Sequence, residues 1–147
     1  MINVKIATSS DRDAVVNLVG KLLSELGGTP PLAEAMSAVF DLLADDGAAG
    51  FVALGETDNG VATVCTVSFL QAMRTAGRYA IIQEMFVEPQ ERSTGVGRAV
   101  LQFALEHAAT RGCSTVELGT PFNGERQIRF YERSGFTNIG ARLRWRL

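Results

Sequence analysis

The chain has 147 residues, of which 46% are hydrophobic and 20% charged, and its net charge at pH 7 is −2. This composition is that of a globular protein, and the small acidic excess argues against general nucleic-acid binding. No apolar run approaches the roughly 20 residues of a membrane span, and the N-terminus lacks the sustained apolar stretch of a signal peptide. We therefore expect one domain over residues 1–147, a cytoplasmic location, and neither nucleic acid nor membrane as a partner.

Hydrophobic periodicity and turn residues predict an alternation of helices and strands. Gly27-Gly28 and Pro30-Pro31 separate the first two helices, because glycine ends a helix and proline prevents its continuation. Asn59-Gly60 is typical of a hairpin turn between two strands. In chain order, the expected elements are a strand over 3–7, helices over 15–26 and 32–44, strands over 51–54, 61–70 and 79–87, a helix over 95–111, a strand over 115–118, a helix over 128–134 and a strand over 136–147.

This order of elements predicts an α/β fold of the mixed α+β kind, with helices on both faces of a mixed sheet. The helix over 95–111 connects the strand over 79–87 to the strand over 115–118. The handedness rule for such connections makes those two strands near-parallel neighbours.

The last expected strand, residues 136–147, has an apolar and a basic face. Leu143, Trp145 and Leu147 alternate with three arginines. A long strand at the end of a sheet leaves an exposed edge, and a homodimer formed through this strand would cover it. The basic face is either a solvated strand face or part of an anion-binding acceptor site, formed by Arg142, Arg144 and Arg146.

The cysteines and the single histidine do not form a recognisable metal or disulfide pattern. Cys65 and Cys113 lie in or beside expected strands, so buried free thiols are expected. His107 falls in the middle of an expected helix, where a solvated position is the simplest interpretation. No metal ion is expected.

The most specific pattern is a glycine-rich turn between an expected strand, which ends at Pro89, and an expected helix. The turn reads Arg92-Ser93-Thr94-Gly95-Val96-Gly97-Arg98. Glycines let a ligand approach the backbone closely, and amide groups at a helix N-terminus attract anions. Val100 stands where a dinucleotide fingerprint has its third glycine, and the Gly-Lys-Ser/Thr of a P-loop is absent. The pattern therefore predicts a phosphate-binding turn that is neither a dinucleotide fingerprint nor a P-loop. The alternative is a plain strand–helix turn without a ligand.

The pattern Arg92-x-x-Gly95-x-Gly97, followed about thirty residues later by Phe130-Tyr131 and Gly135-Phe136, resembles the GCN5-related N-acetyltransferases, or GNAT family. These enzymes use acetyl-CoA as co-substrate. The resemblance implies a three-layer α-β-α sandwich around a central, mostly antiparallel sheet. It also implies that the strand before the turn carries a bulge and splays from its neighbour.

By the same resemblance, amides of the turn hold the CoA pyrophosphate and the preceding strand pairs with the pantetheine arm. A free strand edge suits that kind of pairing. Asn123 matches a position that often contacts the CoA arm, although a turn asparagine explains it equally well. The residues implied in cofactor binding are Met85, Phe86, Val87, Arg92, Ser93, Thr94, Gly95, Val96, Gly97, Arg98 and Asn123.

Two residues are candidates for the acid and base of the reaction. Tyr131 matches the position of a tyrosine that many family members place near the sulfur, where a phenol can donate a hydrogen bond to the departing thiolate. The alternative is an aromatic ring that only packs. Glu84, on the strand before the turn, is the candidate general base, acting directly or through one water. Its alternative is a solvated or ion-paired carboxylate.

The resemblance predicts an acetyl-CoA-dependent N-acetyltransferase that acts on a primary amine of a small molecule by direct transfer. The alternatives are a protein N-terminal or lysine acetyltransferase and a non-catalytic acyl-CoA-binding module. In the family, the first two helices, their connecting loop (here 27–31) and the C-terminal strands line the acceptor pocket. The run 82–92, together with Arg129-Phe130-Tyr131, is similar to aminoalkylphosphonate acetyltransferases, which would suit an arginine-rich pocket.

Overall fold

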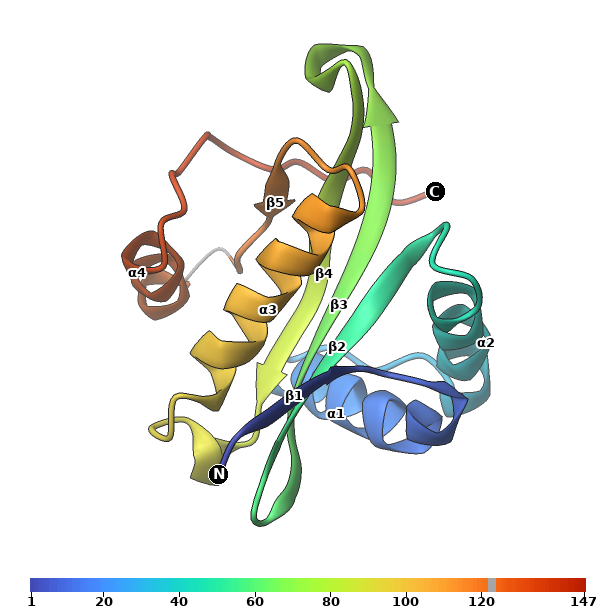
Figure 1. Ribbon diagram of the computed structural model, residues 1–147, viewed down its shortest axis with the longest axis vertical. Coiled ribbons are helices and arrows are strands. Elements are labelled where there is room, and N and C mark those ends of the chain that lie inside the picture. Colours follow the sequence, from blue (N-terminus) through green and yellow to red (C-terminus); the bar gives the residue numbers. More distant parts are fainter. Residues whose placement is uncertain (122–123) are drawn as a thin grey trace. The chain divides into compact units, whose positions relative to one another are not determined.

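The computed structural model describes residues 1–121 and 124–147 (Figure 1). Its contacts divide the chain into two units, residues 1–117 and residues 118–147. The helices and strands are β1 (Asn3–Ile6), α1 (Arg12–Glu25), α2 (Ala33–Ala44), β2 (Gly50–Thr57), β3 (Gly60–Ala72), β4 (Gly77–Val87), α3 (Val96–Thr110), β5 (Val116–Leu118) and α4 (Glu125–Arg133), with short 3-10 turns η1 (Ser9–Asp11), η2 (Met73–Thr75) and η3 (Pro89–Glu91).

The sheet has the strand order β1-β2-β3-β4-β5. The first four strands are antiparallel neighbours. Beside β4, the amide of Ala80 donates to the Thr115 carbonyl and the amide of Ser114 donates to the Arg78 carbonyl, both at 3.0 Å. Residue numbers rise together along this pair, which is the sense of parallel strands. The predicted mixed, mostly antiparallel sheet is therefore confirmed.

Successive residues of β2 point to opposite faces of the sheet, so this strand contributes to the core on both faces within the first unit. Val52 and Leu54 belong to the cluster that packs against α1 and α2. On the other face, Phe51 contacts His107 of α3, and a side chain at Gly55 would meet Val96 and Val100 of α3. This unit thus has three layers, with α1 and α2 on one face of the sheet and α3 on the other, and Figure 1 shows α3 crossing its face.

Gly55 shows how closely α3 approaches the sheet. A Cβ atom at this position would lie 2.6 Å from both the Thr63 and the Val100 side chains. Real side chains do not pack at that separation, so glycine is required here for space. The absence of a side chain on β2 lets the first turns of α3 lie directly against the sheet.

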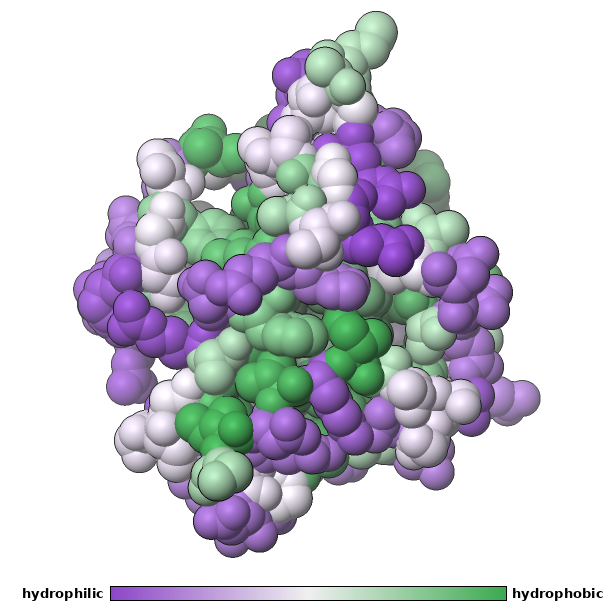
Figure 2. Space-filling model, in the orientation of Figure 1, coloured by the Kyte–Doolittle hydropathy of each residue, from purple (hydrophilic) through white to green (hydrophobic). Residues whose placement is uncertain are grey.

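On the face of the first unit that Figure 2 shows, the apolar patches are small. There, hydrophobic side chains gather over the β1 side and are interrupted by hydrophilic ones. Lys5 of β1, for example, forms ion pairs with Asp11 and Glu56, both at 3.1 Å. Within the described ranges, no helix has the length and apolar character that crossing a bilayer requires.

The strand expected over 136–147 is wrong. Residues 136–147 adopt no regular secondary structure, and Leu143, Trp145 and Leu147 are exposed. Alternation of apolar and polar residues defines two faces, but a strand also needs a neighbour for its backbone hydrogen bonds. Gly140 has φ +129° and its amide bonds the Asn138 side chain, a local turn that interrupts an extended chain. The expected homodimer therefore has no preformed strand over residues 136–147 through which to form.

The expectation for His107 is also wrong, because its ring is half-buried. It meets Phe51 edge to face, with ring centroids 4.5 Å apart, and stacks on Phe103 at 6.1 Å. Burial, and secondarily the charge of Arg111, lowers the pKa of His107 below its usual 6.5. Both cysteines are free thiols, with Cys65 buried as expected and Cys113 half-buried.

Candidate active site

The glycine-rich turn connects the end of β4 to α3 and needs its two glycines for different reasons. Gly95 precedes the helix with φ +89°, a left-handed conformation that side chains with a Cβ rarely adopt. Gly97 has ordinary backbone geometry, but a Cβ there would lie 2.8 Å from Cγ2 of Val87. One glycine therefore sets the direction of the chain, and the other lets the helix pack against the end of β4.

Backbone amides at the start of α3 are available for an anion. Within the turn, the Arg92 amide donates to Pro89 at 3.4 Å and the Thr94 amide to Glu91 at 3.2 Å. The amides of Gly97 and Arg98 lie in the first turn of the helix, where no intrahelical acceptor precedes them. The helix dipole adds a partial positive charge at this point. This geometry suits a phosphate group, as the sequence predicts.

A buried carboxylate lies directly before the turn and accepts hydrogen bonds from the β2–β3 hairpin. Glu91 is only 4% exposed, and its Oε1 accepts hydrogen bonds from Asn59 Nδ2 at 2.8 Å and Thr57 Oγ1 at 3.1 Å. Its backbone carbonyl also accepts from Thr94 Oγ1 at 2.8 Å. A buried carboxylate is tolerated when donors surround it. These bonds tie the β2–β3 hairpin to the turn, a role that no local signal in the sequence indicates.

The Arg92 side chain connects the turn to α1. Its Nη2 donates to both carboxylate oxygens of Glu25, at 3.0 and 2.9 Å, and its Nε donates to the Val87 carbonyl at 3.0 Å. One helical turn earlier on α1, Lys21 pairs with Glu88. Two ion pairs, Lys21–Glu88 and Glu25–Arg92, thus join α1 to the residues that flank η3. In the first pair α1 supplies the cation, and in the second it supplies the anion. We call these two pairs the α1 clamp.

Glu84 lies just after a bulge in β4. Thr66 pairs with Glu84 and Val67 with Ile82, so Gln83 is the extra residue. The bulge places Glu84 on the α1 and α2 face of the sheet, whereas Ile82 pairs with Val67 on the α3 face. The bulge that the family resemblance implies is therefore present, and it decides the direction of the candidate base.

Thr66 holds the Glu84 carboxylate. Its hydroxyl donates to Glu84 Oε1 at 2.5 Å, and the Glu84 amide donates back to Thr66 Oγ1 at 3.1 Å. Burial raises the pKa of the neighbouring Cys65 thiol to about 12, and the negative charge of Glu84 contributes to this rise. Cys65 therefore stays a thiol at neutral pH and is not a nucleophile.

A pocket of about 260 Å³ lies between α1, α2 and the sheet, with Glu84 and Thr66 in its wall. Among the described residues, these two are the polar members of its lining. Pro31 of the loop between α1 and α2 also lines it, as the family resemblance implies. Its apolar wall includes Val15, Val19, Met36, Phe40 and Val52.

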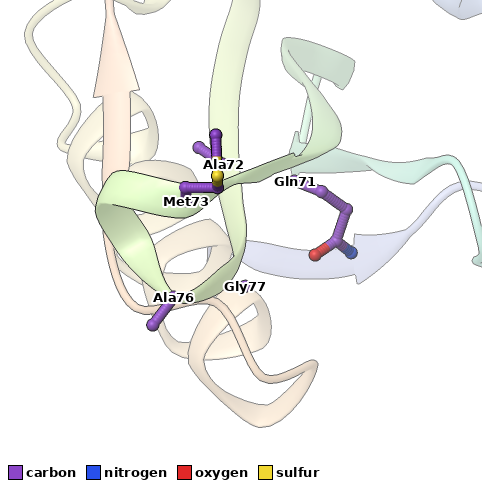
Figure 3. Close-up of a pocket in the computed structure, with 5 residues that line it drawn as sticks. All are labelled: Gln71, Ala72, Met73, Ala76 and Gly77. Atoms are coloured by element: carbon purple, nitrogen blue, oxygen red, sulfur yellow. The ribbon is translucent and has the colours of Figure 1, made fainter.

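A second hollow lies at the other end of the sheet, at the connection between β3 and β4. It is lined by residues of that hairpin alone, with Met73 fully exposed. Figure 3 shows these side chains spread around the tip of the hairpin, with Gln71 pointing away from Met73 and Ala76. Since Gln71 pairs with Arg78 and Thr66 with Glu84, the hollow is remote from the candidate base along the hairpin.

The second unit carries Tyr131, in the last turn of α4. Its ring is half-buried and meets Phe130 and Phe136 edge to face, with centroids 5.2 and 5.5 Å apart. Gly135, with φ +104°, follows the helix, as expected for a glycine that ends it. Asn123 lies outside the described residues. Arg142, Arg144 and Arg146 are exposed, and their place in an acceptor site stays a prediction.

The first unit thus brings together most of the predicted site. Glu84, the strand end Met85–Val87 and the turn Arg92–Arg98 follow one another along a single stretch of chain. Sequence reasoning did not find Thr66 of β3 or Glu25 of α1, which reach the site from other elements, nor the buried role of Glu91 beside the turn. Among the described residues, no group of three or more His, Cys, Asp or Glu side chains could hold a metal ion.

Residues 19–136 match the model of the acetyltransferase (GNAT) family. The chain therefore belongs to this family, and it is an N-acetyltransferase. It is 32% identical to glucosamine 6-phosphate N-acetyltransferase 1 of Oryza sativa subsp. japonica over 127 residues, which cover 83% of this chain and 74% of the relative.

Two further comparisons agree. An uncharacterised N-acetyltransferase of Methanocaldococcus jannaschii is 42% identical over 57 residues, which span 39% of this chain and a quarter (25%) of that relative. The crystal structure of a predicted acetyltransferase with acetyl-CoA, from Clostridium acetobutylicum, superposes with a TM-score of 0.83. It is 19% identical in sequence, and the match covers 99% of this chain and 96% of that one. This structural similarity establishes the fold.

Proposed function

We propose that this protein transfers the acetyl group of acetyl-CoA directly to a primary amine of a small molecule. The observation that carries this proposal is that one strand serves two sites. Glu84 lies in the wall of the pocket, and three residues later β4 ends and leads into the glycine-rich turn. An acceptor in the pocket and a thioester held along the end of β4 would therefore meet at this strand.

The chain has features that fit acetyl-CoA. The turn at Gly95 and Gly97 leaves room for close approach to the backbone, and the first amides of α3 suit the pyrophosphate. β5 spans three residues and β4 eleven, so β5 can pair with only part of β4. The end of β4, at Met85–Val87, is the edge we propose for the pantetheine arm. The relative from Clostridium acetobutylicum was solved with acetyl-CoA, which supports this assignment.

The proposed chemistry needs a base and an acid. The acceptor nitrogen forms the new C–N bond as the thioester C–S bond breaks. Glu84 first takes the ammonium proton so that the neutral amine can attack. Tyr131 supplies a proton to the sulfur, and the second proton that the nitrogen loses as the amide forms returns to the tyrosinate. Thr66 positions the Glu84 carboxylate through its hydrogen bond. Tyr131 and Asn123 enter this proposal through the family resemblance alone.

A small acceptor is preferred over a protein substrate because of the size of the pocket. A volume of about 260 Å³ is just below the usual range for a ligand pocket and holds roughly nine groups of the size of water. An N-terminal or lysine acetyltransferase would need an open groove for the flanking peptide. The pocket walls from α1 and α2 suit a compact molecule better.

Calorimetric titration with acetyl-CoA tests the cofactor assignment. Ser93 is exposed in the turn, so Ser93→Asp adds a negative charge there without disturbing packing. We expect micromolar binding by the wild type and at least tenfold weaker binding by Ser93→Asp. The control Gln71→Glu adds the same charge at the remote β3–β4 hairpin and should bind normally. Absence of binding by a folded wild type would overturn the proposal.

A further inference from the structure

The pocket at Glu84 has an unusual distribution of polarity for a site that takes a charged amine. Its wall is built from aliphatic and aromatic side chains of α1, α2 and β2, and its polar atoms belong to Thr66 and Glu84. Phe40, at 3% exposure, and Val52, at 1%, form its inner part. A ligand that enters it therefore meets one carboxylate and otherwise apolar surface.

Positive charge is missing from this lining. Among the described residues, no lysine or arginine lines the pocket. The guanidinium of Arg12 lies 6.0 Å from the Phe40 ring centroid, but it pairs with Asp41 at 2.7 Å and is thereby neutralised. A phosphate or phosphonate placed here would lose its hydration without gaining a cation, which is strongly unfavourable.

We infer that the acceptor is a primary amine on a compact apolar body, such as a short alkylamine or an arylalkylamine, with its nitrogen at Glu84. This inference rests on the proposed acetyl transfer. The ammonium group would be held by the one carboxylate, and the hydrocarbon part would displace water from the walls formed by Val15, Met36 and Phe40. The pocket chemistry thus separates this chain from its rice relative, whose name specifies a phosphorylated amino sugar.

The inference predicts how the rate depends on chain length. Each methylene buried in an apolar wall improves binding by about fourfold at room temperature. In the series from propylamine to hexylamine, kcat/KM should therefore rise by about fourfold per carbon. The rise should stop only with amines longer than hexylamine, once the pocket, with room for roughly nine water-sized groups, is full.

The experiment measures release of free CoA from acetyl-CoA with a panel of amines. It compares the alkylamine series and phenethylamine with glucosamine 6-phosphate and 2-aminoethylphosphonate. We expect kcat/KM at least tenfold higher for the apolar amines. A preference for the phosphorylated amines, or acetyl-CoA binding without transfer to any apolar amine, would overturn the inference. Failure to bind acetyl-CoA at all would instead overturn the proposed function.

A pair of variants on α2 adds a second readout. Val39 lines the pocket and is 55% exposed, whereas Leu42, at 67%, lies on the same helix outside the lining. Val39→Lys puts a cation at the rim without burying it, so it should raise KM for hexylamine at least tenfold. Leu42→Lys makes a matched change and should leave KM unaltered. Equal effects of the two variants, with acetyl-CoA affinity unchanged, would contradict a pocket in this position.

Discussion

The Arg92 guanidinium contacts both carboxylate oxygens of Glu25, at 3.0 and 2.9 Å, although 67 residues separate them in sequence. Arg92 opens the glycine-rich turn, and Glu25 is the last residue of α1, a helix that lines the pocket at Glu84. With Lys21–Glu88, this pair makes a direct connection between the acceptor side and the cofactor side of the proposed site. Both partners are about half exposed, so the connection positions the turn more than it stabilises the fold.

The α1 clamp should therefore affect binding more than folding. Glu25→Gln removes the charge that holds Arg92, while the bond from Arg92 Nε to Val87 remains. We expect the free energy of unfolding to change by less than about 1 kcal/mol, as for exposed ion pairs. Acetyl-CoA affinity should fall a few-fold. The control Glu34→Gln, on the exposed first turn of α2, should change neither quantity, and equal affinity of both variants would contradict the positioning role.

Glu84→Gln tests the general base. The amide keeps the size of the side chain and can still accept from Thr66, but it cannot take a proton. We expect kcat to fall by about 10²-fold or more, with acetyl-CoA affinity unchanged. Glu106→Gln, on the exposed side of α3, is the control. Turnover within a few-fold of wild type would show that Glu84 is not the base.

Tyr131→Phe removes the proposed acid and keeps the ring that packs on Phe130 and Phe136. If the phenol protonates the sulfur, kcat should fall by about 10²-fold. The free energy of unfolding, measured by chemical denaturation, serves as the control because the aromatic contacts remain. A normal rate in the variant would assign Tyr131 a packing role only.

Two glycine-to-alanine changes should affect stability in opposite directions. Gly95→Ala forces a residue with a Cβ into φ +89° and should cost about 1–2 kcal/mol. Gly20 lies within α1 with no atom within 4 Å of an added Cβ, so Gly20→Ala should stabilise by about 0.5–1 kcal/mol. Chemical denaturation measures both. A loss of stability in Gly20→Ala would contradict this account of α1.

His107 should make stability depend on pH. Because its pKa is lowered in the folded protein, the folded state binds fewer protons than the unfolded state just below 6.5. The contribution of His107 is therefore complete above 6.5 and is lost as the pH falls toward the lowered pKa. Denaturation from about pH 8 to about pH 5 should show a smaller loss of stability for His107→Gln than for wild type. Asp11 and Glu56, whose pKa values are also lowered, act at more acidic pH.

The sequence alone predicted the elements whose signals are local. Gly95, Gly97 and Pro89 define the strand–turn–helix unit through backbone freedom and proline geometry, which depend on neighbours in the chain. The helix over 96–110 and the hairpin at Asn59-Gly60 likewise follow from periodicity and turn preference. This local pattern carried the family resemblance, which is confirmed, and the predictions of a phosphate-binding turn and a candidate base, which stay predictions.

The tertiary structure decided what those elements do together. Alternation over 136–147 predicted a strand, but a strand forms only where another backbone supplies hydrogen bonds, and sequence periodicity does not supply that partner. The bulge at Gln83 turned Glu84 toward the pocket, and Thr66 and Glu25 reached the site across large sequence separations. The apolar character of the proposed acceptor pocket depends on side chains from three separate elements, whose proximity results from packing rather than from any one segment.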